Sequence, residues 1–505
     1  MKPLTIQRLR QDGQAFMEEI SREYYLAGAG LKPTADLQRV YERHASTIGP
    51  DALALVRAEL RCTSPATEAH RQARMLLEWL AELQISRDLA PLEEREIAWE
   101  SSAILRLEDT RELEYHRATI TIANTTDRRE RLLIERALNA VVGAELAPMR
   151  REGFERGQRI VESLDLADGY NATFEALSGI ALGELGAQCE AFLDETDALW
   201  EDTYPRFVRK SLNIEPRDAT RGDAAALFRR REFDEQFPAS SMEWEIRRQM
   251  REMGIDPIAG GRVLYDTDDR PGKRARAFCA PVRTPDEVYL VLRPHGGQSD
   301  WSTFLHELGH ALHFGNMNRE LPFEYRWLGD NSITEGYAML FDHLMHDAGW
   351  LKRYTPLASS RLDAFMRSTA FEELHFLRRY TAKLLYELDL HGGLIPFDRL
   401  PELYVERLTR ATSFRYDPSH AFVDVDPRYY VARYLRAWQL QALLTETLIH
   451  RYNEDWWRNP QAGPWIATEL FAEGQKELAP ELAKRVSNSA LGFGPLQRAI
   501  ERELA

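Results

Sequence analysis

Apolar residues recur at helical spacing through the first half of the chain. Two stripes at this spacing consist of Ala73, Leu76, Leu77, Leu80 and Gln84, and of Leu133, Ala137, Val141 and Ala144. Because positions three and four residues apart share one face of an α-helix, these stripes predict amphipathic helices. We therefore expect a helical N-terminal part that extends to about residue 255.

The pattern changes after residue 255. Helix-breaking residues cluster at 257–261 and 266–272, and a run of β-forming residues follows at 287–294. The run closes with Pro294, which cannot donate a ladder hydrogen bond, so it predicts an edge strand; a buried inner strand is the alternative. Helical spacing then returns to the end. The expected fold is mainly α with one small β-sheet, in a single unit with parts 1–255 and 256–505.

Composition narrows the classes of function. The 505 residues are 44% hydrophobic, with a mean hydropathy of −0.46, and no apolar run approaches the length of a membrane span. No signal-peptide region follows the first residues, so we expect a cytoplasmic protein with no membrane partner. The net charge of −15 disfavours nucleic acid as a partner. Cys62, Cys189 and Cys279 are widely spaced and predict neither a disulfide framework nor a cysteine metal site.

One short segment carries the strongest chemical signal. It reads His306-Glu307-Leu308-Gly309-His310. Residues i and i+4 share a helix face, so His306 and His310 can present ring nitrogens to one zinc ion, with Glu307 beside it to accept a proton from water. The segment therefore predicts a hydrolytic zinc centre with one catalytic ion.

A catalytic zinc ion needs a third protein ligand and an open position for water. A metzincin is excluded because His313 and Asn316 stand where that class has Gly and His. A thermolysin-like spacing falls at Asp330, but Glu335 is the better candidate, since it lies in the first turn of a predicted helix that could face the metal. The alternative is that Ser332 and Glu335 form a capping box, which needs no metal.

Other polar residues near the motif have supporting roles in this interpretation. We expect His313, His343 and His346 to pack near the centre or to contact its ligands, because zinc would already have three ligands. Asp342, two turns after Glu335, is a candidate to contact a metal-ligating side chain and support it. These residues are therefore not expected to bind the metal directly.

The extended motif, residues 306–313, resembles the HExGHxxH motif of the thimet oligopeptidase and oligoendopeptidase F family. The interval from His310 to Glu335 also fits that family, and residues 265–274 and 277–279 resemble its aromatic-acidic stretch, Gly-Lys turn and small-residue strand. The resemblance implies a bilobed helical ellipsoid with a deep substrate channel and zinc on the channel floor. It also implies that a strand just before the zinc helix pairs with the bound peptide.

The resemblance further points to residues far from the zinc motif. Tyr430, Ala432 and Tyr434 are similar to the family's Tyr-x-Ala-x-Tyr, which implies Tyr434 as a hydrogen-bond donor to the oxyanion, with Tyr430 one turn earlier. The family has a histidine in a glycine-rich loop ahead of these tyrosines. His420 is the histidine nearest to that place, although the glycines are missing, and it is the candidate for a substrate or oxyanion contact.

These observations predict zinc-dependent hydrolysis of internal bonds in short peptides, with Glu307 activating the water. The first alternative is a carboxypeptidase or dipeptidyl carboxypeptidase of the same fold. From another class, an inactive peptide-binding protein with zinc remains open, although an intact Glu307 argues against it. A zinc hydrolase that cleaves an ester or epoxide is the third alternative. The sequence leaves the oligomeric state open.

Overall fold

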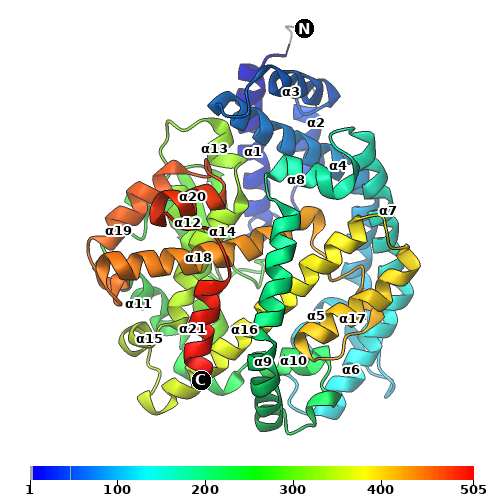
Figure 1. The fold of residues 1–505 in the computed structure, drawn as a ribbon, viewed down its shortest axis with the longest axis vertical. Helices are drawn as coiled ribbons and strands as arrows, with labels where there is room; N and C mark the ends of the chain where they lie inside the picture. Colours follow the sequence, from blue (N-terminus) through cyan, green and yellow to red (C-terminus); the bar gives the residue numbers. More distant parts are fainter. Residues whose placement is uncertain (1–3, 46) are drawn as a thin grey trace. The chain divides into compact units, whose positions relative to one another are not determined.

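The computed structural model describes residues 4–45 and 47–505 and is mainly α-helical, as expected (Figure 1). Its α-helices are α1 (Ile6–Gly28), α2 (Leu37–His44), α3 (Pro50–Cys62), α4 (Glu68–Ser102), α5 (Tyr115–Asn124), α6 (Arg128–Val141), α7 (Ala147–Ser163), α8 (Gly169–Ser178), α9 (Leu182–Leu212), α10 (Arg221–Phe228), α11 (Ala239–Glu252), α12 (Gln298–Asn316), α13 (Phe323–Trp327), α14 (Asn331–Asp342), α15 (Ala348–Tyr354), α16 (Ser359–His391), α17 (Leu400–Thr412), α18 (Tyr430–Tyr452), α19 (Ala462–Trp465), α20 (Ala479–Ser487) and α21 (Gly494–Leu504). The strands are β1 (Ile104–Arg106), β2 (Glu112–Glu114), β3 (Val263–Asp266), β4 (Phe278–Arg283) and β5 (Glu287–Val291).

The chain forms two compact units, each assembled from three separate segments. Unit 1 consists of Met1–Gln84, Phe233–Met366 and Arg436–Leu496. Unit 2 consists of Ile85–Glu232, Arg367–Leu435 and Gln497–Ala505. The units are not consecutive along the chain, whereas the expected lobes are. This division into units does not test the expected boundary near residue 255, which stays a prediction.

The sheet of unit 1 has the strand order β3-β5-β4. β5 pairs in parallel with β3 and antiparallel with β4, so it is the middle strand. The expectation of an edge strand at 287–294 is therefore wrong. Its premise was Pro294, but β5 ends at Val291, so the missing N–H falls outside the ladder.

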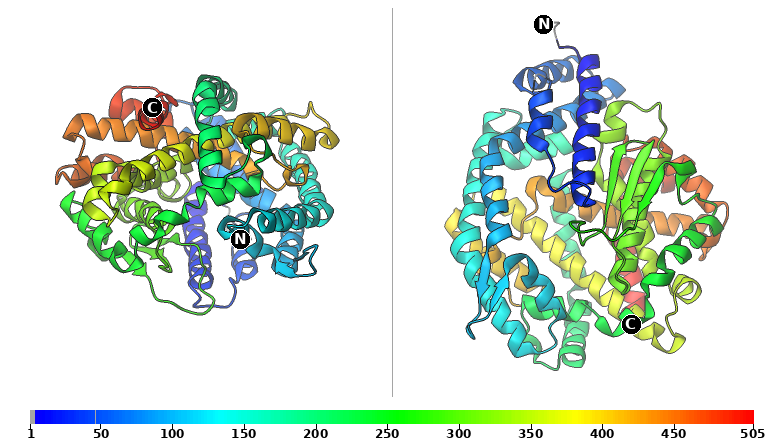
Figure 2. Two further views of the ribbon diagram at one scale, coloured as in Figure 1. Left: turned by 90° about the horizontal axis from the view of Figure 1, so that it is seen from below. Right: turned by 180° about the vertical axis from the view of Figure 1, so that it is seen from behind.

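Alternation along β5 buries both faces of this sheet. Val288 and Leu290 belong to the large core that also contains much of α12. Tyr289 and Val291 face the other way, toward α1, where the rings of Tyr25 and Tyr289 stack with their centroids 3.8 Å apart. The right-hand view of Figure 2 shows α1 in blue beside the strands. The sheet thus lies between α1 and α12.

Helices α12 and α14 pack closely because a glycine lies at their contact. A Cβ atom on Gly309 would lie 2.6 Å from the Cα of Ala338 and 2.9 Å from the carbonyl oxygen of Tyr337. Only a residue without a side chain lets the two backbones approach this far. This approach sets the spacing between the residues that each helix presents to the other.

Unit 2 contains the second sheet, which the sequence did not predict. β1 and β2 form a small antiparallel hairpin, with Ile104 opposite Glu114. Each strand has three residues, so neither is long enough for the period-two alternation that would identify it in the sequence.

Candidate metal centre

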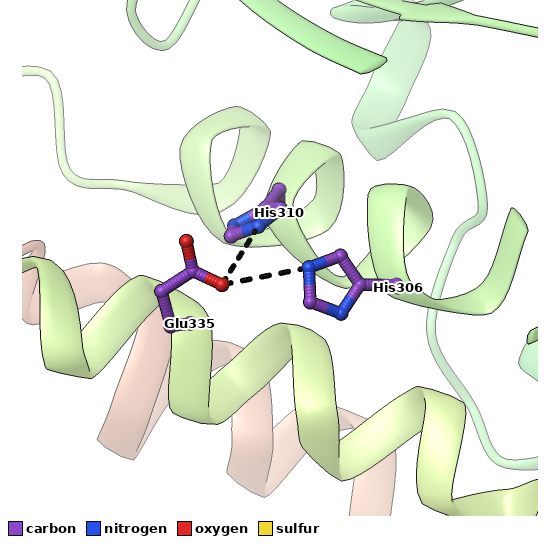
Figure 3. Close-up of side chains that lie close together, drawn as sticks. All are labelled: His306, His310 and Glu335. Atoms are coloured by element: carbon purple, nitrogen blue, oxygen red, sulfur yellow. Dashed lines mark ion pairs between the residues drawn. The ribbon is translucent and has the colours of Figure 1, made fainter. Parts of the chain in front are cut away.

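Three side chains from two helices converge in unit 1. His306 and His310 come from α12 and Glu335 comes from α14 (Figure 3). The Oε2 atom of Glu335 lies 3.5 Å from Nε2 of His306 and 3.7 Å from Nε2 of His310. A potential ligand atom from each of the three residues lies within 4.8 Å of the others. The structure thus brings together the three residues that the sequence singled out as metal ligands.

The opposite ring nitrogen of each histidine has its own partner. Nδ1 of His306 lies 2.8 Å from Oδ2 of Asp342, and Nδ1 of His310 lies 2.8 Å from Oγ1 of Thr334. These contacts fix the ring orientations and turn both Nε2 atoms toward Glu335. Asp342 was a candidate for such a supporting contact from the sequence. Thr334 was not, because a threonine before a glutamate carries no distinctive signal.

Glu335 is not explained by helix capping. The N-cap of α14 is Asp330, whose side chain accepts a hydrogen bond of 2.9 Å from the N–H of Ser332. Ser332 is therefore inside the helix, and the expected alternative of a Ser332–Glu335 capping box is wrong. Glu335 is only 6% exposed, and a buried carboxylate needs a compensating charge or hydrogen bonds. It faces the two histidines instead of the helix terminus.

The donor set fits a zinc ion. Two ligands that each lie about 2.0–2.1 Å from a tetrahedral zinc ion are separated by about 3.4 Å, close to the two distances between Glu335 and the histidines. Two imidazoles and one carboxylate also leave a fourth position for water, as a catalytic site requires. The residues present could therefore hold one ion without rearrangement of the backbone.

Electrostatics at this place also favour a cation. Burial opposes a charge on His306, but the nearby carboxylates of Asp342 and Glu335 outweigh burial and raise its pKa to about 10. Burial lowers the pKa of His310 to about 4. The carboxylates of Glu335 and Asp342 thus stabilise one positive charge between them, and a metal ion would supply that charge in place of the proton on His306.

Glu307 is on α12, and its side chain is directed at the sheet. Its Oε2 atom accepts a hydrogen bond of 2.8 Å from the N–H of Cys279 on β4. Burial raises the pKa of Glu307, while the charge of His306 acts in the opposite direction. The backbone of Cys279 is thus a positioning group that sequence reasoning did not identify, since a main-chain N–H leaves no trace in residue identity.

The other histidines near the motif contact neighbouring side chains, and the supporting role expected for them stays a prediction. His313 is fully buried, with its ring 4.9 Å from that of Tyr337 and 5.6 Å from that of Phe471. Nδ1 of His343 lies 2.6 Å from Oδ1 of Asp342, so this carboxylate contacts two histidines. The ring of His346 lies 4.5 Å from that of His343.

The remaining candidate residues belong to unit 2. Tyr430 and Tyr434 lie in the first turns of α18 on one face, with ring centroids 5.0 Å apart. His420 is buried, and its Nε2 atom lies 2.9 Å from Oδ1 of Asn139. Burial lowers the pKa of His420 to about 3, so this histidine is neutral in the folded protein. The roles expected for these three residues stay predictions.

Comparison with characterised sequences gives a partial match. No protein-family model matches the chain. Oligoendopeptidase F (chromosomal) of Lactococcus lactis subsp. cremoris is 25% identical over 145 residues, which are 28% of this chain and 23% of that protein. The chain resembles oligoendopeptidase F. The resemblance expected from the motifs is thereby confirmed, over less than a quarter of the relative's length.

Two solved structures share the fold of this chain over nearly its whole length. A candidate peptidase from Chlamydophila abortus has a TM-score of 0.68 at 14% identity and covers 99% of this chain and 89% of its own. A carboxypeptidase of Pyrococcus furiosus has a TM-score of 0.61 at 14% identity and covers 100% of both chains. At this level of identity the likeness concerns the fold.

Proposed function

We propose that the protein is a zinc-dependent peptidase that cleaves internal bonds of short peptides. The observation that carries the proposal is the convergence of His306, His310 and Glu335 on one point, with Glu307 held beside them. The partial match to an oligoendopeptidase and the fold shared with a carboxypeptidase support the same class of reaction.

Each residue has a defined task in this proposal. His306, His310 and Glu335 hold the ion, and Asp342 and Thr334 keep the two imidazoles oriented. A bound zinc ion would polarise the scissile carbonyl and lower the pKa of its water ligand toward about 7. Glu307 accepts the proton of the attacking water and returns it to the leaving amine. The hydrogen bond from Cys279 keeps the Glu307 carboxylate directed at this position.

The free edge of β4 is the place where this proposal puts the substrate backbone. β4 pairs with β5 on one side, and no other strand among residues 4–45 and 47–505 pairs with its opposite side. An extended peptide can add to such an edge through main-chain hydrogen bonds. Cys279 lies on β4, so a peptide added there would lie beside Glu307.

The resemblance adds residues from unit 2 to the proposal. Tyr434 would donate a hydrogen bond to the oxyanion, Tyr430 would assist it, and His420 would contact the substrate. Replacement of Tyr434 by Phe removes only the hydroxyl, so we expect kcat to fall by about two orders of magnitude, as for other oxyanion donors. Unchanged kcat in this variant would remove Tyr434 from the mechanism.

The decisive experiment uses wild type and Glu307→Gln on a library of short peptides, with cleavage followed by mass spectrometry. Glu307→Gln should bind one zinc ion per chain, measured by elemental analysis, yet lose peptide cleavage, because the amide cannot accept the proton. A chelator should abolish wild-type cleavage, and added zinc should restore it.

The products separate the remaining alternatives. Internal cuts support the oligoendopeptidase, whereas stepwise C-terminal trimming would identify a carboxypeptidase. Zinc binding with no cleavage of any peptide would contradict the proposal and favour an inactive peptide-binding protein, or a hydrolase of another bond. The expected cytoplasmic location stays a prediction; no helix among the described residues is long and apolar enough to cross a membrane.

A further inference from the structure

The segment that leads into β4 passes beside the candidate active site. Cys279, the second residue of β4, donates its N–H to Glu307, so this N–H points away from the partner strand β5 and toward the free edge. The three residues before β4 are Ala275, Arg276 and Ala277, of which Ala275 and Arg276 are exposed. An extended peptide that adds to this edge near Glu307 would continue past one end of β4.

Arg276 differs from the other arginines around this sheet. The guanidinium of Arg274 lies 5.6 Å from the centre of the Phe278 ring, that of Arg283 lies 4.0 Å from Glu287, and that of Arg293 lies 2.7 Å from Asp269. Arg276 has no ion pair or hydrogen bond within the part of the chain that the structure describes. An arginine at this place is thus available to bind a ligand.

Arg276 lies close along the chain to the residue that contacts Glu307, which is Cys279. Along an extended chain, the three residues from Cys279 to Arg276 span at most about 10 Å. A group bound by Arg276 therefore lies within about three peptide residues of the bond that Glu307 would help to cleave.

The ligand that matches this arginine is a carboxylate. A guanidinium presents paired N–H donors that fit the two oxygens of a carboxylate. The chain as a whole carries a net charge of −15 and would repel an acidic peptide, so a local cation matters for any substrate that carries a negative charge near the cleaved bond. The carboxylate could belong to the C-terminus of the peptide or to an Asp or Glu side chain.

We propose that Arg276 is a specificity residue that binds a substrate carboxylate within about three residues of the cleaved bond. The inference rests on the proposed peptidase function and adds a preference to it. Binding of the C-terminal carboxylate would fix the distance of the cut from the end of the peptide. Binding of a side chain would instead select internal sites beside Asp or Glu.

The test compares matched peptides on three proteins. One peptide series carries either a free or an amidated C-terminus, and a second series replaces Gln by Glu at each position in turn. Wild type, Arg276→Gln and the matched control Arg274→Gln are assayed for kcat and KM at low and moderate salt. Zinc content and thermal stability are measured for each, and neither should change because Arg276 is exposed.

We expect wild type to cleave the carboxylate-bearing member of a pair about tenfold more efficiently, mainly through KM, with a smaller ratio at higher salt. In Arg276→Gln the ratio should fall to near one, whereas Arg274→Gln should keep it. The series that shows the preference identifies the source of the carboxylate.

Three results would overturn the inference. One is the absence of any preference in wild type, and another is a preference that Arg276→Gln retains. The third is an equal loss of cleavage for charged and neutral peptides in Arg276→Gln, together with an acid limb of the pH profile moved to higher pH, which would mean that Arg276 acts on Glu307 and not on the substrate. Absence of cleavage of every peptide by wild type would instead contradict the proposed function itself.

Discussion

At the scale of single residues, the two histidines proposed as metal ligands differ in the group that their Nδ1 atoms contact. His306 has the carboxylate of Asp342 at its Nδ1 atom, whereas His310 has the hydroxyl of Thr334. A carboxylate stabilises the imidazole more strongly as it donates charge to a metal, and a hydroxyl mainly orients the ring. Asp342 also contacts His343, so its position is fixed from two sides.

Asp342 should therefore matter for metal affinity. We expect Asp342→Asn to weaken zinc binding by about 10–100-fold, because the amide keeps the shape of the carboxylate but loses its charge. Competition with a chromogenic chelator measures the affinity. Thr334→Val removes the contact to His310 and is the matched comparison. It should weaken zinc binding less than Asp342→Asn does. An equal loss in the two variants would show that ring orientation alone, and not the carboxylate charge, supports the site.

Several of these residues could be predicted from the sequence and others could not. His306, Glu307 and His310 are separated by fixed helical intervals, so one turn of helix brings them together. Glu335 could be predicted as a ligand because its helix could be predicted. Only the structure excludes the alternative that Glu335 is a capping residue. The N–H of Cys279 belongs to a backbone group, and residue identity does not encode its partner.

At the scale of elements, the contact between α12 and α14 decides whether the three candidate ligands meet. The contact is close at Gly309, where a Cβ atom would lie 2.6 Å from the backbone of Ala338. Ala338 lies one helical turn after Glu335, and Gly309 directly precedes His310. A change in the distance between these helices therefore moves Glu335 relative to the histidines.

Gly309→Ala should separate the two helices. We expect a loss of about 1–3 kcal/mol in the free energy of unfolding, as for other overpacked sites, and weaker zinc binding. Denaturant unfolding and metal titration measure the two effects. Gly183→Ala in α9 is the control, since a Cβ atom there meets nothing within 4 Å. If Gly309→Ala behaves like this control, the close approach does not hold the site together.

The order of strands was harder to predict than the presence of the sheet. The apolar run at 287–294 correctly predicted β5 as a strand. Its place in the sheet depends on parallel pairing with β3, from which β4 separates it along the chain, and on antiparallel pairing with β4. The prediction of an edge strand from Pro294 failed because Pro294 lies beyond the last paired residue of β5. The order of strands in a sheet depends on which strands pair, and the hydrophobic pattern of one strand does not indicate its partners.

At the scale of the whole molecule, each unit has a cluster of charged side chains of its own. Unit 1 has Glu335 and Asp342 at the candidate metal centre. Unit 2 has Asp424, which accepts a hydrogen bond of 2.9 Å from Tyr404, pairs with Arg379 and lies 3.8 Å from Arg221. Although burial acts in the opposite direction, these cations hold the pKa of Asp424 far below its ordinary value. This group needs no metal ion for compensation.

Asp424→Asn should destabilise unit 2 at neutral pH. We expect a loss of about 3–5 kcal/mol, because the substitution leaves the buried Lys383 and the largely buried Arg379 without this carboxylate. The folded-state pKa is depressed, so the contribution of Asp424 is present above its unfolded pKa of about 4 and is lost as the pH falls below that value. The difference from wild type should therefore shrink in acid.

Denaturant unfolding of both proteins at several pH values measures this difference. Asp398→Asn is the control: Asp398 pairs with Arg151 at 2.6 Å, but its side chain is 81% exposed. An exposed pair contributes less than about 1 kcal/mol. A constant difference between Asp424→Asn and wild type from neutral pH to pH 3 would mean that packing, and not charge, accounts for the loss.

The interleaved segments of the two units affect how the chain can fold during synthesis. Unit 1 requires Arg436–Leu496, and unit 2 requires Gln497–Ala505, in addition to earlier segments. Chains emerge from the ribosome N-terminus first, and domains made of one continuous segment can fold as soon as they emerge. Here neither unit is complete before residue 496 has been made. The early helices stay partly folded until then, and we expect the nascent chain to depend on protection from aggregation until residues 436–505 have been synthesised.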